Sequence, residues 1–184
     1  MSRLGSIGFV QSFSVTRERG WTPDLTSMRK RFISKTPERV QPQVGDWLDL
    51  ERAAVVEVTS EEENFPVESA LVSGDTRGWR AAIPGTQTIR LLFDQPQKLR
   101  RISLVFEEHE TTRTQEFVLR WSSDGGRSFR EIVRQQWNFS PPQTVQEVQA
   151  YEVELSNLTV LELIITPDIS GGMARASVKS LRVS

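Results

Sequence analysis

A glycine-marked turn between two apolar-patterned runs constrains the fold of this chain more than any other stretch. Phe117, Leu119 and Trp121 recur at every second position, which is the pattern of a strand with one buried face. The sequence Ser-Ser-Asp-Gly-Gly follows, and an apolar pattern resumes at 128–133. Glycine reaches the positive φ angles that a turn between twisted strands requires. The stretch 114–134 is therefore predicted to form a β-hairpin.

The same alternation recurs along the rest of the chain. Turns are predicted at Asp94-Gln95-Pro96 and at Gly171-Gly172, and the apolar phase slips by one position between Val178 and Leu181, which predicts a β-bulge. About nine strands at this spacing are typical of an antiparallel β-sandwich. Besides the hairpin, the alternating runs are 53–59, 89–93, 102–106, 151–155, 161–165 and 174–183.

The charge distribution divides the chain in two. Residues 1–45 hold eight basic and three acidic residues, a net charge of +5, whereas the remainder holds 15 and 21, a net charge of −6. We therefore predict a basic arm at 1–45 and a sandwich domain at 46–184. Within the arm, Thr22-Pro23-Asp24 is a typical helix start, and one short helix is predicted at about 22–34.

The predicted arm helix is amphipathic. An apolar stripe would pack on this protein or on a neighbour, because so short a helix is marginal alone in water. A basic face would meet acidic positions of the body or an acidic partner. The stripe consists of Leu25, Met28, Phe32 and Ile33, and the basic face includes Arg29, Lys30 and Arg31.

Several kinds of chemistry are excluded by composition. The chain has no cysteine, hence no disulfide framework and no thiol nucleophile, and the single histidine, His109, excludes a zinc site built from several histidines. Nothing resembles a Ser-His-Asp constellation, and Glu107, Glu108 and Glu110 are typical of a solvated loop rather than of a catalytic carboxylate pair. We expect no enzyme activity and no cofactor.

The partners and the location are constrained in the same way. The acidic body lacks interleaved basic and aromatic positions, so nucleic acid is not expected to bind. No apolar run is long enough to span a membrane, and the start of the chain does not follow the pattern of a signal peptide. We expect a cytoplasmic protein.

With these patterns in view, the chain from about residue 53 to its end resembles the galactose-binding-like family, which comprises jelly-roll domains of the discoidin and coagulation-factor type C kind. The order and spacing of four stretches carry the resemblance: ESALVSGDTRGW, QTIRLLFD, LRRISLVF and FVLRWSSDGGRSFREI. The resemblance implies an all-β antiparallel jelly roll of about eight to nine strands, whose loops at one end bind sugars, lipids or proteins. Most members of the family are not catalytic.

The resemblance also suggests ligand-binding residues. In sugar-binding relatives, a histidine or arginine on the loops binds hydroxyl groups while an aromatic ring stacks on the sugar. His109 and Arg113, in one predicted polar loop, match this pattern loosely, and Trp137, Asn138 and Phe139, in a second predicted loop, would supply stacking and an amide. The alternative is that Trp137 and Phe139 cap the core and that His109 is merely exposed.

Many relatives bind a structural calcium ion through backbone carbonyls and an acidic residue before a tryptophan, with a glutamate on the last strand. Asp75 matches the loop acid and is the one candidate ligand. Lys179 stands where the glutamate would help, and an ammonium group there opposes calcium binding. We therefore expect no bound metal.

Two functions remain from the sequence. The first is a non-catalytic binding module that binds carbohydrate through loops at one end of the sandwich. The alternative is a protein-interaction or accessory subunit, in a larger complex or a homo-oligomer, that docks through the arm and the sandwich surface.

Overall fold

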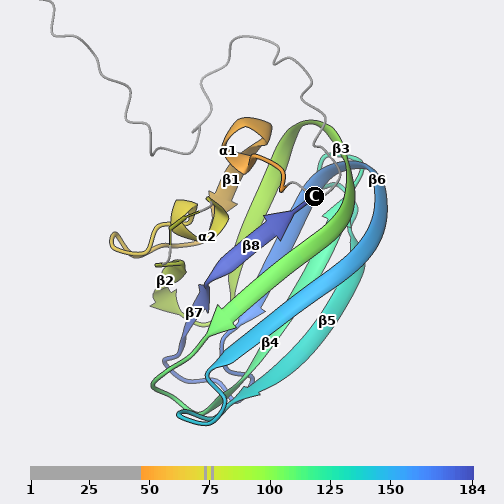
Figure 1. The fold of residues 1–184 in the computed structure, drawn as a ribbon. Coiled ribbons are helices and arrows are strands. Elements are labelled where there is room, and N and C mark those ends of the chain that lie inside the picture. Colours follow the sequence, from red (N-terminus) through yellow and green to blue (C-terminus); the bar gives the residue numbers. More distant parts are fainter. Residues whose placement is uncertain (1–46, 73, 76) are drawn as a thin grey trace, which may run out of the picture.

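The structure is a computed structural model that describes residues 47–72, 74–75 and 77–184. The predicted arm helix, with its apolar stripe and its basic face, lies outside the described residues. Those residues form eight strands and two helices of one turn each (Figure 1). The elements are α1 Leu50–Ala53, β1 Ala54–Val58, α2 Glu68–Leu71, β2 Trp79–Pro84, β3 Gln87–Glu107, β4 Arg113–Ser122, β5 Arg130–Phe139, β6 Gln146–Thr166, β7 Arg175–Val178 and β8 Ser180–Val183.

Two long strands organise the fold. Strands β3 and β6 have 21 residues each and pair antiparallel from Gln87↔Ile165 to Glu107↔Gln146. Both ribbons curve at the same end of the molecule (Figure 1), where the register shifts between Leu92 and Arg101 and Asn157 adopts a φ of 57°.

The turn predicted at Asp94-Gln95-Pro96 is therefore wrong. These residues lie at the curve, where the chain stays extended because β6 bends alongside β3. Pro96 is tolerated there because ladder pairing is irregular at that point and its missing N–H leaves no regular hydrogen bond broken. The four runs predicted at 89–93, 102–106, 151–155 and 161–165 are accordingly two strands instead of four.

The bend places the halves of these strands in two layers. The first half of β3 pairs with β1, and the second half of β6 pairs with β4, which also pairs with β5. The second half of β3 pairs with β8 in the other layer. The rings of Phe106 in β3 and Phe117 in β4 meet between the layers, with centroids 5.0 Å apart. Tyr151 of β6 also donates a hydrogen bond to Gln135 of β5, 2.8 Å away.

The prediction of an all-β, antiparallel jelly-roll sandwich is thereby confirmed. Its core is apolar, and each large side chain buried there contributes roughly 1.5–3 kcal/mol to stability. Trp79 is buried, whereas Trp121 is only partly buried against the core. The largest fully buried side chains include Trp79, Phe106, Phe117, Phe139, Ile89 and Leu91.

The end of the chain differs from the sequence-based prediction. The phase slip between Val178 and Leu181 is a change of partner instead of a bulge within one strand. Strand β7 pairs with β2, while β8 pairs with β3 after Lys179, whose N–H donates to the carbonyl of Val105 at 2.8 Å. Lys179 is thus the residue at which the chain passes from pairing with β2 to pairing with β3.

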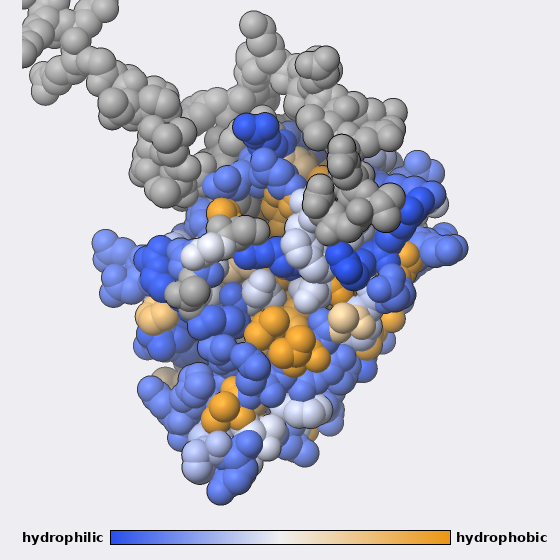
Figure 2. All heavy atoms as spheres, viewed as in Figure 1, coloured by the Kyte–Doolittle hydropathy of each residue, from blue (hydrophilic) through white to orange (hydrophobic). Residues whose placement is uncertain are grey.

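The surface shown in Figure 2 is mostly hydrophilic, and its hydrophobic areas are separated by polar residues. Among the described residues, no helix is long and apolar enough to cross a membrane. The large hydrophobic residues that are exposed are Trp47, Ile83, Val148, Ile169 and Met173.

Candidate functional site

A pocket of about 550 Å³ lies at the loop end of the sandwich, lined by residues 112–114, 138–140 and 168–170. The first segment leads into β4, the second ends β5, and the third follows β6. Three separate parts of the sequence therefore meet at this pocket. Its lining supplies hydroxyl groups, an amide, a carboxylate and the exposed side chain of Ile169.

Backbone pairing holds the three segments in place. Thr114 lies opposite Asn138 in the β4–β5 ladder, and the Thr114 hydroxyl donates to Asn138 Oδ1 at 2.7 Å. The N–H of Ile169 donates to the carbonyl of Thr114 at 2.9 Å, which ties the loop after β6 to the start of β4. The sheet, together with the hydrogen bond from Ile169, consequently sets the relative positions of the three segments.

Arg113 lies beneath the pocket and anchors its loops. Its guanidinium Nη1 donates to the carbonyls of Pro167 and Arg175, both at 3.1 Å, and its Nε lies 2.8 Å from Glu108 Oε2. Only 2% of the side chain is exposed. Burial lowers the pKa of Arg113, which the Glu108 carboxylate partly offsets. The guanidinium thus joins the loop before β4, the loop after β6 and the first residue of β7.

Asp168, which is partly exposed, and Asn138, which is exposed, supply the carboxylate and the amide of the pocket, beside the exposed hydroxyl groups of Thr112, Ser140 and Ser170. Asp168 Oδ1 accepts hydrogen bonds from the N–H of Ser170 at 3.0 Å and from its hydroxyl at 2.7 Å. These bonds, with a smaller contribution from the charge of Arg113, hold the pKa of Asp168 below its ordinary value of 3.8. The carboxylate is therefore ionised at neutral pH.

The five residues predicted to bind a ligand are divided by the structure. The pocket brings together Arg113, Asn138 and Phe139, but His109 and Trp137 do not line it. His109 has 66% of its side chain exposed, in the loop between β3 and β4. Trp137 packs against the core, partly buried, and its indole N–H has no hydrogen-bond partner among the described residues.

The loop predicted for Trp137, Asn138 and Phe139 is wrong, because all three belong to β5. Strand alternation turns Asn138 outward and directs Trp137 and Phe139 toward the core, and Phe139 is 1% exposed. The ring of Phe139 lies under Arg113, with the guanidinium carbon 5.9 Å from its centroid. Phe139 therefore offers no accessible ring for stacking, and the ring of Trp137 does not line the pocket.

Sequence reasoning missed Asp168, Ile169 and Ser170. The only signal was the turn at Gly171-Gly172, which marks a loop but does not show which other loop it adjoins. The pairing of β6 with β4 brings the loop after β6 next to the start of β4, at one end of the sandwich.

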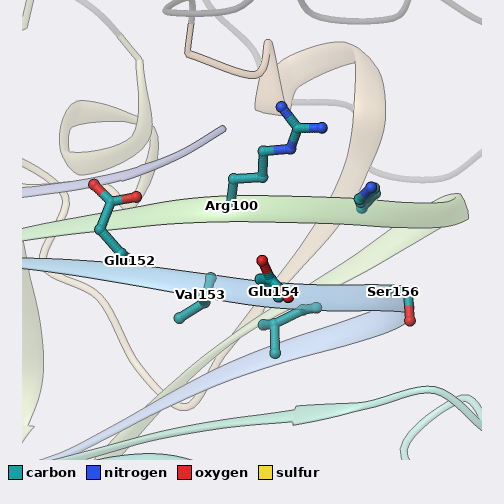
Figure 3. A pocket seen from close by; sticks show the side chains of 7 residues that line it. Arg100, Glu152, Val153, Glu154 and Ser156 are labelled. Carbon is teal, nitrogen blue, oxygen red and sulfur yellow. The ribbon is translucent and has the colours of Figure 1, made fainter.

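A second depression, of about 580 Å³, lies on β3 and β6 and is shown in Figure 3. Arg100 and Glu152 point to one side of these strands, and Val153 points to the other. Its charged residues, Lys98, Arg100, Glu152 and Glu154, are two bases and two acids, so their charges cancel. It is built from strand residues and lacks the hydroxyl and amide groups of the loop-end pocket, apart from Ser156.

The structural calcium implied by the resemblance does not fit this chain. The carboxylate of Asp75 is bound by Arg77 and by the hydroxyl of Ser69. The side-chain hydrogen bond from Arg77 is the largest of the effects that hold the pKa of Asp75 well below its usual range. From the last strand, the Arg182 guanidinium donates to the carbonyls of Ala70 and Val72.

Cationic groups of the protein thus engage the oxygen atoms that a calcium ion would need in this region. Lys179 Nζ also lies 2.9 Å from Glu107 Oε2. Across the part of the chain that the structure describes, no group of three or more His, Cys, Asp or Glu residues is arranged to hold a metal ion.

The described pocket contains a single carboxylate. Asp168 is the only carboxylate among its lining residues, so the described pocket has no carboxylate pair for glycoside hydrolysis. In the predicted acidic loop, Glu107 pairs with Lys179 and Glu108 with Arg113, which assigns these two acids to ion pairs.

No family model matches the sequence, and no curated protein matches it. Solved structures share its fold. A family 32 carbohydrate-binding module from Clostridium perfringens, in complex with GalNAc-β-1,3-galactose, is 18% identical with a TM-score of 0.56, over 75% of this chain and 99% of that chain. Another family 32 module, from a family 31 glycoside hydrolase of C. perfringens, is 17% identical with a TM-score of 0.56, over 78% and 98% of the two chains.

The C-terminal domain of a chitobiase from Bacteroides fragilis is 19% identical with a TM-score of 0.55, and the similarity covers 76% of this chain and 97% of that chain. Together with the strand order described above, these likenesses show that the chain has the galactose-binding-like jelly-roll fold, as the sequence predicted.

Proposed function

We propose that this galactose-binding-like jelly roll is a non-catalytic carbohydrate-binding module whose site is the loop-end pocket. The observation that carries the proposal is the lining of that pocket. Hydroxyl groups, the Asn138 amide and the Asp168 carboxylate converge there from three separate segments of the chain. Such a mixture of donors and acceptors suits a ligand rich in hydroxyl groups.

The fold supports the same proposal. Structures with this fold and similar dimensions include carbohydrate-binding modules, one of which was solved with a galactose-containing disaccharide. The protein-docking alternative rests on the basic arm, which lies outside the described residues, and no described contact favours it.

The proposal is tested by measuring binding of the full chain to a panel of oligosaccharides, followed by the variant Asn138→Ala. Asn138 is exposed, and its amide accepts one hydrogen bond from Thr114, so the substitution leaves the core intact. We expect affinity for the bound oligosaccharide to fall by about ten-fold, because one or two hydrogen bonds to the ligand are lost.

Lys98→Ala is the matched control, since Lys98 lines the depression on β3 and β6 instead. It should leave the affinity unchanged. Loss of binding in Lys98→Ala, with wild-type binding in Asn138→Ala, would contradict the placement of the site, and no binding to any oligosaccharide would contradict the function.

A further inference from the structure

The described lining of the loop-end pocket holds one cation, Arg113, and one anion, Asp168, but only the anion is accessible to a ligand. The positive charge of Arg113 is buried and faces the Glu108 carboxylate at 2.8 Å. Its Nη1 is also occupied by the carbonyls of Pro167 and Arg175. The guanidinium is consequently committed to the protein, and the accessible charge in the pocket is that of Asp168.

The hydrogen-bonding groups of Asp168 and Asn138 are complementary. Both hydrogen bonds from Ser170 reach Asp168 Oδ1, which leaves Oδ2 available to accept a hydrogen bond from a ligand. Thr114 donates to Asn138 Oδ1, so the amide offers its Nδ2 as a donor. An acceptor and a donor in one pocket match two neighbouring hydroxyl groups, one donating and one accepting.

The apolar part of the pocket is aliphatic. Phe139 is 1% exposed and cannot stack on a ligand, whereas Ile169 is 49% exposed. The C–H face of a sugar ring would therefore rest on Ile169.

Resting on the carbohydrate-binding function proposed above, we infer that the pocket selects neutral sugars and rejects acidic ones, with adjacent hydroxyl groups bound by Asp168 and Asn138 and the ring on Ile169. A uronate, sialate or sulfate group would bring a second negative charge beside Asp168, with no accessible cation in the described pocket to compensate it. Like charges at such distances repel, and salt screens the repulsion.

The test compares each neutral oligosaccharide with its uronate counterpart, such as galactan and galacturonan fragments of equal length, by titration calorimetry at low and high salt. We expect the neutral ligand to bind at least about ten-fold more tightly at low salt, with a smaller ratio at high salt. This comparison needs no variant and does not depend on how a substitution affects folding.

The variant Asp168→Asn then tests whether the charge of Asp168 causes the selectivity. Asparagine keeps an acceptor for Ser170 but removes the charge. The variant should bind the neutral ligand about ten-fold more weakly. The ratio of its affinities for the neutral and the acidic ligand should be smaller than in the wild-type protein. Glu154→Gln, which removes a charge in the depression on β3 and β6, should change neither value.

The two proposals fail differently. If neither neutral nor acidic oligosaccharides bind, the carbohydrate-binding function is overturned. If acidic ligands bind as tightly as neutral ones, or if Asp168→Asn leaves the ratio unchanged, the selectivity is overturned while the binding function stands.

Discussion

At the scale of single residues, guanidinium groups hold the loops of this protein together. Arg113 ties the loop after β6 and the start of β7 to β4, beneath the loop-end pocket, through the carbonyls of Pro167 and Arg175. Arg182 does the same beside α2, through the carbonyls of Ala70 and Val72. A planar, permanently charged group with several donors suits both tasks, because it satisfies carbonyls that the fold would otherwise leave without partners.

Arg182 gives a prediction about metal dependence. Since its guanidinium engages the carbonyls near α2, chelation with EDTA should leave the melting temperature of the wild-type protein unchanged. Arg182→Ala should lower the free energy of unfolding by about 1–3 kcal/mol, because two carbonyl acceptors lose their donor. Chemical denaturation measures this loss.

Arg182→Lys is the matched control, since it keeps the charge but cannot reach both carbonyls with a fixed fork. We expect a smaller loss than in Arg182→Ala. A wild-type melting temperature that rises with added calcium would contradict this account.

At the scale of elements, the β4–β5 hairpin shows how local sequence determines local structure. The predicted hairpin is confirmed, and its pairing, from Arg113↔Phe139 to Trp121↔Arg130, extends beyond the predicted range of 114–134. Gly125 and Gly126 have φ angles of 74° and 88°, which explains the two glycines. The register shifts between Leu119 and Arg120, and Trp121, expected in the core, is only partly buried beyond that point.

The carboxylate of Asp124 organises the turn of this hairpin. Its Oδ1 accepts from the N–H groups of Arg127 and Ser128, both at 3.0 Å, and its Oδ2 accepts from the Ser128 hydroxyl at 2.6 Å. Hydrogen bonds from the side chains of Ser122 and Ser128 are the first of the causes that hold the pKa of Asp124 well below its usual range.

Asp124→Asn is therefore expected to lower the melting temperature by a few degrees at neutral pH. Because the folded protein has the lower pKa, the stability that Asp124 contributes is fully present above the ordinary pKa of 3.8 and is lost as the pH falls through the folded value. The difference between wild type and variant should shrink below about pH 4. Thermal melts from pH 7 to pH 3 measure it, and a difference that stays constant down to pH 3 would contradict the role of the charge.

At the scale of the whole molecule, the described domain closes on itself. Its start and its end meet, because the N–H of Leu48 donates to the carbonyl of Val183 at 2.8 Å. The Arg101 guanidinium also lies over the ring of Trp47, with its carbon 4.2 Å from the centroid. The described core runs from Leu50 to Val183.

A chain that begins at Gln43 should consequently fold alone. We expect cooperative thermal unfolding, with a melting temperature within about 2 °C of the full chain, because every described core residue is retained. The full-length protein is the control in the same scan. An aggregated product, or one that melts without cooperativity, would show that the domain needs residues of the arm.

The sequence by itself determined that the chain is built of strands, and it placed the hairpin, since both follow from local patterns: alternation at Phe117 and Leu119, and glycines at a turn. Features that depend on distant partners were decided only in the tertiary structure. Asp94 to Pro96 look like a turn but stay extended, because β6 bends with β3.

The candidate site also depends on contacts between distant parts of the chain, so it was only partly predicted from the sequence. The family resemblance suggested Arg113 and Asn138, but their burial and exposure depend on which face of a strand points to the core. Asp168 and Ile169 carry no signal of their own, because the loop after β6 reaches β4 only through the pairing of those two strands. A site assembled from three distant segments has no local pattern, since its geometry comes from the sheet that brings the segments together.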